Sequence, residues 1–229
     1  MTLLKICGLR QPEQAAEIAS LGVDAIGVIA VPGSPRHLPP AERPAVFAAA
    51  RGANPACQGV LVVANPEPSR LDALGAGQGH QVVQLHGDET PEHCRQLRAA
   101  LPGVSLWKAV RVRSCDDLER AMHYQDCVDA LLLDAWVSGQ LGGTGEAIPL
   151  ALLQTFNPPL PWWLAGGMQA DSAAAALAVL NPSGLDASSG VERSPGDKDP
   201  ARVAALLAVV RATRQDRSTP IPAPPSPCP

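Results

Sequence analysis

The sequence predicts an α/β protein with a single catalytic domain, a (β/α)8 barrel (TIM barrel) over residues 1–214. Three observations predict this fold. Short apolar runs typical of β-strands alternate with stretches whose apolar residues recur at helical spacing. Such alternation requires the strands to pair in parallel. Eight strand–helix units fit into about 214 residues, which lies within the usual length of this barrel.

The predicted elements follow one another as eight pairs. Each strand is a short apolar run, and each helix begins after a polar or proline-containing turn. Thr90 before Pro91, and Asp199 before Pro200, are typical helix starts, because the first residue caps the helix and proline fits its first position. The predicted strands cover residues 3–7, 24–31, 58–63, 81–86, 105–110, 129–135, 161–167 and 183–190. The helical stretches cover residues 11–22, 41–52, 66–75, 90–103, 114–124, 147–156, 171–180 and 199–214.

The alternative fold is an open, doubly wound parallel sheet. That fold usually carries a G-x-G-x-x-G motif after its first strand. The first predicted strand is followed only by "CGL" at residues 7–9. The sequence therefore favours the closed barrel.

The composition excludes several classes of function. Hydrophobic residues make up 46% of the chain and charged residues 17%, which is typical of a globular protein. The net charge of −4 and the lack of a basic block argue against nucleic-acid binding. No apolar run reaches the ~18 residues of a membrane span, and "MTLLKICGLRQPEQ" is not typical of a signal peptide. The sequence thus predicts a protein with no nucleic-acid or membrane partner.

The cysteines predict a reducing compartment rather than a disulfide framework. Six are present, with no C-x-x-C spacing and no metal-ligand spacing relative to the five histidines. Free thiols in a chain of this length are typical of the cytoplasm. We therefore expect a cytoplasmic protein without a metal site. Residues 215–229 are rich in proline, which predicts a disordered tail that contains Cys228.

Donor-rich loops follow the last two predicted strands. This barrel commonly binds phosphate at these two loops, because glycine-rich turns expose backbone N–H groups. The alternative is that the glycines only turn the chain. The candidate phosphate-binding residues are Gly166, Gly167, Ser188, Ser189 and Gly190.

Cys7 and Asp134 end two other predicted strands and are the candidate catalytic pair. Lys5 shares a strand face with Cys7, and a nearby cation would favour the thiolate and make Cys7 a general base. Asp134 follows an apolar strand, where burial would raise its pKa and suit a general acid. The alternatives are a packing thiol and a carboxylate paired with Lys5 or Lys108.

Two further residues at the strand ends are candidates for substrate binding. Arg36 lies in a proline-rich loop, where it could hold a ligand carboxylate or be a solvated surface side chain. His86 ends the fourth predicted strand and could shape the site or cap the strand. These residues together indicate an acid–base step on a small phosphorylated molecule.

Taken as a set, several motifs resemble the phosphoribosylanthranilate isomerase family. The resemblance spans about residues 3–210 and rests on "KICGL", "GVDAIGVIAVPGSPRHL", "VVQLHGDE", "LLLDA…GGTG", "WWLAGGM" and "GLDASSGVERSPGDKD". It implies a single-domain barrel of tryptophan biosynthesis that needs no cofactor. The implied reaction is the Amadori rearrangement of N-(5′-phosphoribosyl)anthranilate to a 1-deoxyribulose 5-phosphate.

The resemblance also implies roles for individual residues. Cys7 matches the general base and Asp134 the general acid. Arg36 matches the arginine near the anthranilate carboxylate. The phosphate-binding ends match Gly166, Gly167, Ser188, Ser189 and Gly190, with Asp186 nearby.

Two positions depart from the family pattern, and other functions remain open. Gly33 stands where a basic residue is usual before "SPR", and Glu146 stands where a lysine is usual after "GGTG". The alternatives are a barrel like indole-glycerol-phosphate synthase and a non-catalytic phosphosugar-binding barrel. Either way the expected partner is a small phosphorylated substrate, and the expected assembly is a monomer or homodimer.

Overall fold

Eight parallel strands form a closed barrel in sequential order, β1 to β8. The computed structural model describes residues 1–135 and 147–218, except for the side chains of residues 68–70 and 215–218. Parallel pairing of β1 with β8, from Leu3 opposite Gly184 to Ile6 opposite Ala187, closes the sheet. The barrel prediction is therefore confirmed, and the open sheet is excluded. The strands are β1 Leu3–Cys7, β2 Ala25–Ile29, β3 Gln58–Val63, β4 Val82–Leu85, β5 Ser105–Val112, β6 Ala130–Ala135, β7 Trp162–Leu164 and β8 Gly184–Ala187.

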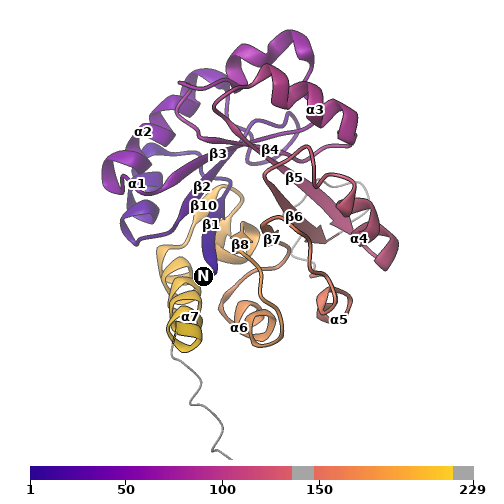
Figure 1. Ribbon diagram of the computed structural model, residues 1–229. Coiled ribbons are helices and arrows are strands. Elements are labelled where there is room, and N and C mark those ends of the chain that lie inside the picture. The colour runs from indigo at the N-terminus through magenta and orange to yellow at the C-terminus, as the bar shows by residue number, and fades with distance from the viewer. Residues whose placement is uncertain (136–146, 219–229) are drawn as a thin grey trace, which may run out of the picture.

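Helices surround the barrel, and α7 runs beside the N-terminal strand (Figure 1). Two predicted caps are confirmed: Thr90 Oγ1 accepts a hydrogen bond from the His93 N–H at 3.2 Å, and Asp199 Oδ1 accepts one from the Ala201 N–H at 2.9 Å. The α-helices are α1 Pro12–Ser20, α2 Arg43–Ala53, α3 Pro91–Ala100, α4 Cys115–Met122, α5 Leu150–Leu153, α6 Ala170–Val179 and α7 Pro200–Ser218. The 3-10 helices are η1 Pro40–Glu42, η2 Pro68–Leu74 and η3 Ser189–Val191.

Three features differ from the expected elements. The segment after β3 forms the 3-10 helix η2, because prolines precede it and glycines follow it. The helix after β6 is only one turn, since Pro149 precedes α5 and prolines follow it. α7 continues to Ser218, beyond the end of the predicted helix at residue 214. Residues 219–229, with Cys228, lie outside the described part of the chain.

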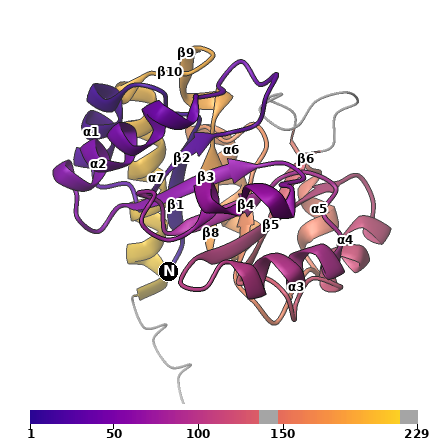
Figure 2. The ribbon, with the colours of Figure 1, turned by 90° about the horizontal axis from the view of Figure 1, so that it is seen from above.

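A small antiparallel hairpin after β8 was not predicted. It consists of β9 Glu192–Ser194 and β10 Asp197–Lys198. Gly196 lies at the turn with a φ of +85°, a conformation that glycine adopts without strain. Figure 2 shows this hairpin near α1, and Gln14 of α1 donates to Asp197 of β10 at 2.9 Å. The hairpin matters because its two ends carry buried charged residues next to the barrel mouth.

Two tryptophans fill much of the barrel interior. Trp107 of β5 and Trp163 of β7 lie with ring centroids 4.6 Å apart. They belong to an inner cluster of small and branched side chains that is distinct from the larger core between sheet and helices. Gly184 makes room for them, because a Cβ atom there would lie 2.3 Å from Trp163 Cε3. Two of the chain's seven aromatic residues thus supply bulk to the barrel interior.

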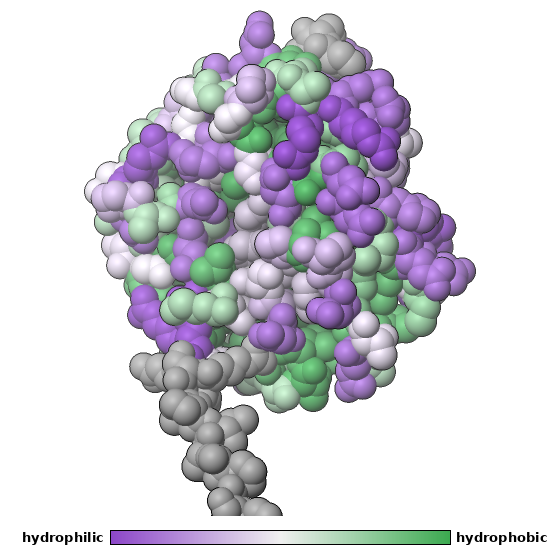
Figure 3. Space-filling view, viewed as in Figure 1, coloured by the Kyte–Doolittle hydropathy of each residue, from purple (hydrophilic) through white to green (hydrophobic). Residues whose placement is uncertain are grey.

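The face of the molecule seen in Figure 3 is predominantly polar. Figure 3 shows hydrophilic side chains spread over one face, with smaller apolar patches between them. Met1 and Val179 are the large hydrophobic side chains that are exposed among the described residues. Within residues 1–135 and 147–218, no helix is long and apolar enough to cross a membrane.

Replacing Gly184 tests the packing of the barrel interior. We expect Gly184→Ala to lower the free energy of unfolding by about 1–3 kcal/mol, because the added methyl group would displace Trp163. Urea denaturation measures this change. Gly52→Ala is the matched control, since Gly52 lies in α2 with open space around it, and alanine favours the helix by about 0.5–1 kcal/mol. Equal effects of the two substitutions would contradict this packing model.

Candidate active site

A cavity of about 600 Å³ opens at the carboxyl ends of the barrel strands. This is the face where barrels of this kind carry their reacting groups. The cavity contains nine of the ten predicted site residues, and Gly190 is the exception. The nine are Cys7, Arg36, His86, Asp134, Gly166, Gly167, Asp186, Ser188 and Ser189.

Cys7 ends β1 inside the cavity and is 5% exposed. Gly27 of β2 leaves room for its thiol, because a Cβ atom there would lie 2.8 Å from Cys7 Sγ. Burial raises the pKa of the Cys7 thiol above its ordinary value, although Lys5 acts to lower it. Burial has the larger effect, so Lys5 does not by itself bring the pKa of Cys7 below its ordinary value.

Lys5 forms an ion pair with Asp186. Its Nζ atom lies 2.9 Å from both carboxylate oxygens of Asp186, the residue opposite it on β8. Burial raises the pKa of Asp186 even with this partner. Lys108 likewise pairs with Glu89 at 2.8 Å. Neither lysine is the partner of Asp134, so the ion-pair interpretation of Asp134 is wrong.

Asp134 faces His86 across the cavity mouth. Asp134 is 5% exposed, and its Oδ1 atom accepts a hydrogen bond from the Ala135 N–H at 3.0 Å. Its Oδ2 atom lies 3.4 Å from Nε2 of His86. Nδ1 of the same ring lies 2.9 Å from Nε2 of Gln84, a residue that the sequence did not single out. His86 therefore lies between Gln84 and Asp134 in the wall of the cavity.

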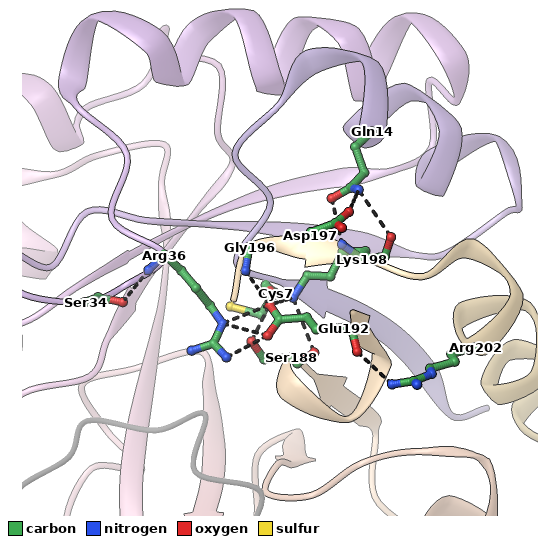
Figure 4. A network of polar contacts seen from close by, with 10 residues as sticks. All are labelled: Cys7, Gln14, Ser34, Arg36, Ser188, Glu192, Gly196, Asp197, Lys198 and Arg202. Atoms are coloured by element: carbon green, nitrogen blue, oxygen red, sulfur yellow. Dashed lines mark hydrogen bonds and ion pairs between the residues drawn. The ribbon is translucent and has the colours of Figure 1, made fainter. Parts of the chain in front are cut away.

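Arg36 is held by a buried carboxylate rather than exposed to solvent. Its Nε and Nη2 atoms donate to Glu192 at 2.9 and 2.7 Å, so the expectation of a solvated arginine is wrong. Glu192 also accepts from Nζ of Lys198 at 2.6 Å and from the Gly196 N–H at 3.0 Å. Figure 4 shows these groups converging next to Cys7. The pKa of Glu192 is below its ordinary value, because these donors outweigh the cost of burial.

The loops after β7 and β8 are joined closely. Gly166 and Gly167 have φ angles of +89° and +61°, which favour glycine. A Cβ atom on Gly190 would lie 2.3 Å from the carbonyl oxygen of Met168. Gly190 thus allows the two loops to approach each other, which explains why it does not line the cavity. The Ser188 hydroxyl donates to the Cys7 carbonyl at 3.1 Å, so it ties the end of β8 to β1.

Gly33 and Glu146 are the two positions that depart from the family pattern. Gly33 lines the cavity with a φ of +83°, and nothing lies within 4 Å of the position its Cβ atom would take. Glu146 lies outside the described residues. Within the described ranges, no group of three His, Cys, Asp or Glu side chains could hold a metal ion.

The fold and the site define a class of protein: a barrel enzyme with a thiol on β1 and a carboxyl group on β6 facing one cavity. Known proteins agree with this class. The family model described as N-(5′-phosphoribosyl)anthranilate isomerase matches residues 4–209. The proteins of that name from Trichormus variabilis and Synechococcus elongatus are 47% and 48% identical over 204 residues, or 89% of this chain and 96% and 94% of theirs.

Solved structures give the same result. The phosphoribosyl anthranilate isomerase of Thermotoga maritima superposes with a TM-score of 0.82 at 29% identity, covering 93% of this chain and all of that one. The enzyme of Thermus thermophilus gives a TM-score of 0.77 at 30% identity, covering 92% and 99%. The chain therefore belongs to the N-(5′-phosphoribosyl)anthranilate isomerase family. It is an isomerase of tryptophan biosynthesis, as its motifs predicted, and not an indole-glycerol-phosphate synthase.

Removing the carboxylate of Glu192 tests the buried ion cluster. We expect Glu192→Gln to lower the free energy of unfolding at neutral pH by about 3–5 kcal/mol, because Arg36 and Lys198 would lose their shared partner. The folded-state pKa of Glu192 is depressed, so its contribution is present above the ordinary pKa of about 4.5 and is lost as the pH falls through the folded pKa. The difference from the unsubstituted protein should therefore shrink below pH ~4.5.

Denaturant titrations at several pH values measure this difference. Glu92→Gln is the control, since Glu92 pairs with Arg95 on the exposed face of α3 and should change stability by less than ~0.5 kcal/mol. A gap for Glu192→Gln that stayed constant down to acidic pH would contradict the assigned charge state.

Proposed function

We propose that Cys7 and Asp134 carry out the isomerisation as general base and general acid. Asp134 donates a proton to the ring oxygen of N-(5′-phosphoribosyl)anthranilate, and the C1′–O bond breaks to give an iminium ion. Cys7 then removes the proton from C2′, giving an enolamine. Loss of the enol proton and addition of one at C1′ give the ketone product. The observation that carries this assignment is that both groups line one cavity from β1 and β6.

The rest of the cavity supplies groups for the two anionic ends of the substrate. Backbone N–H groups near Gly166, Gly167 and Ser189 would bind the phosphate, since glycine-rich loops at this position suit anions. Arg36 would bind the anthranilate carboxylate through its Nη1 atom, because Nε and Nη2 donate to Glu192. A solved relative was crystallised with reduced 1-(o-carboxyphenylamino)-1-deoxyribulose 5-phosphate, which carries both of these groups.

The assignment extends to compartment and assembly. We expect the enzyme to act in the cytoplasm, and the five cysteines recorded as free among the described residues support a reducing environment. We expect a monomer or homodimer; the Thermotoga maritima relative is described as dimeric and has been converted to monomers. Sedimentation of the purified chain distinguishes the two states.

Substituting the proposed acid and base tests their roles. We expect Cys7→Ala and Asp134→Asn each to lower kcat by about 10²–10⁴-fold, the usual contribution of one positioned proton-transfer group. The assay follows the fluorescence of N-(5′-phosphoribosyl)anthranilate made in situ, which the enzyme should remove faster than the uncatalysed reaction does.

Cys57→Ala is the matched control, because Cys57 is a buried thiol outside the cavity. It should cost about 1 kcal/mol of stability and leave kcat unchanged. Full activity of Cys7→Ala would refute the role of Cys7.

The titration of Cys7 predicts the alkaline side of the pH profile. The thiolate is the reactive form, and burial raises the pKa of this thiol, so little thiolate is present at neutral pH. We expect kcat/KM to increase as the pH rises from about 7 to 9, because this quantity reports groups of the free enzyme. A value of kcat/KM that was constant over this range would show that another group, or a fully formed thiolate, acts as the base.

A further inference from the structure

The β9–β10 hairpin places a second buried lysine near Cys7. Lys198 is completely buried, and its Nζ atom lies 2.6 Å from Glu192 and 3.3 Å from the Ser188 carbonyl oxygen. Ser188 in turn donates its hydroxyl proton to the Cys7 carbonyl at 3.1 Å. Lys198 is therefore separated from the backbone of Cys7 by one residue, as Figure 4 shows. The proposed roles of Cys7 as base and Asp134 as acid do not by themselves involve Lys198.

Burial without charge compensation would be very costly for this lysine. The ammonium group is compensated by Glu192, whose carboxylate also binds Arg36 through two atoms. One carboxylate thus serves two buried cations, and the cluster retains a net positive charge of one. Arg36 extends into the cavity from the same cluster. A net positive charge beside a thiol favours its ionised form.

The charges around Cys7 come from several packed elements. Lys5 on the same strand is neutralised by Asp186, which acts to raise the pKa of Cys7. Lys198 also acts to lower the pKa of Cys7, less than Lys5 does, and its own partner Glu192 is shared with Arg36. The charged and titratable groups that face Cys7 or share its cavity are Lys5, Arg36, His86, Asp134, Asp186, Glu192 and Lys198.

We propose that Lys198 is a positioning residue for the reaction, whose ammonium group, held by Glu192 and Ser188, stabilises the Cys7 thiolate without touching the substrate. This inference rests on the proposed function of Cys7 as the base. The inference assigns a role to the β9–β10 hairpin. The hairpin places the Lys198 ammonium group near Cys7, on the far side of the loop that follows β8. It also explains how a thiol that burial keeps protonated can ionise when a proton must leave the sugar.

The test measures the ionisation of Cys7 directly and needs no substrate. Iodoacetamide alkylation of the full-length protein is followed between pH 6 and 11, and the peptide that contains Cys7 is quantified by mass spectrometry. We expect Lys198→Met to move the midpoint of Cys7 alkylation upward by about one pH unit or more, because removing a nearby positive charge disfavours the thiolate. The rise of kcat/KM with pH should also move to higher pH.

Arg193→Met is the matched control. It removes one positive charge from the same hairpin, but Arg193 is exposed and pairs with Asp197 on the surface. It should leave the Cys7 midpoint unchanged. Lys198→Gln is the second variant, since its amide can still donate to Glu192 while the charge is lost, and thermal unfolding verifies that each variant is folded. An unchanged midpoint in folded Lys198→Met and Lys198→Gln overturns the proposal, as does an equal shift in Arg193→Met.

The two hypotheses can fail separately. A shifted Cys7 midpoint together with unaffected turnover in Cys7→Ala would support the electrostatic role of Lys198 and refute Cys7 as the base. An unchanged midpoint together with inactive Cys7→Ala would do the reverse.

Discussion

The pairing of β1 with β8 is the constraint on which the whole site depends. It joins residues about 180 positions apart in the chain and closes the sheet. Closure places Lys5 opposite Asp186 and brings the Ser188 hydroxyl to the Cys7 carbonyl. An open sheet would leave Cys7 at one edge and the loop after β8 at the other. The thiol and the donor-rich loops share a cavity only because the barrel is closed.

Closure also concentrates charge in a small volume. Within the described residues, buried ion pairs lie inside or beside the barrel mouth: Lys5 with Asp186, Lys108 with Glu89, and Glu192 with both Arg36 and Lys198. Such pairs do little for net stability, because desolvation offsets their attraction. Their role here is to fix the orientation of side chains. Each one fixes a long side chain in a single position, and a reaction that moves two protons needs its groups held in this way.

Much of this arrangement could be predicted from the sequence. The strands are apolar runs, so their ends and the residues that follow them locate the mouth. For this reason Cys7, Asp134 and the glycines of the last loops were identified without a structure. The partners were harder to predict, because pairing across the barrel depends on register. Lys5 acts to lower the pKa of Cys7, but it also pairs with Asp186, which only the β1–β8 register reveals.

Residues in polar loops were missed for a related reason. Glu192 and Lys198 stand in "GVERSPGDKD", where charged residues are normally solvated. Only the hairpin turns them inward, and the one available signal was a charged pair flanking a Pro-Gly turn. Gln84 was missed because a single amide inside an apolar strand looks like an isolated exception. Its contact with the His86 ring requires coordinates.

The neighbouring indole rings of Trp107 and Trp163 make the protein's own fluorescence a probe of the cavity. Trp163 is two residues before Ala165, which lines the cavity, so the pair lies one layer beneath the bound substrate. Anthranilate absorbs light in the region where tryptophan emits. Occupancy of the cavity should therefore quench indole emission by energy transfer. This quenching allows ligand binding to be measured before any bond changes.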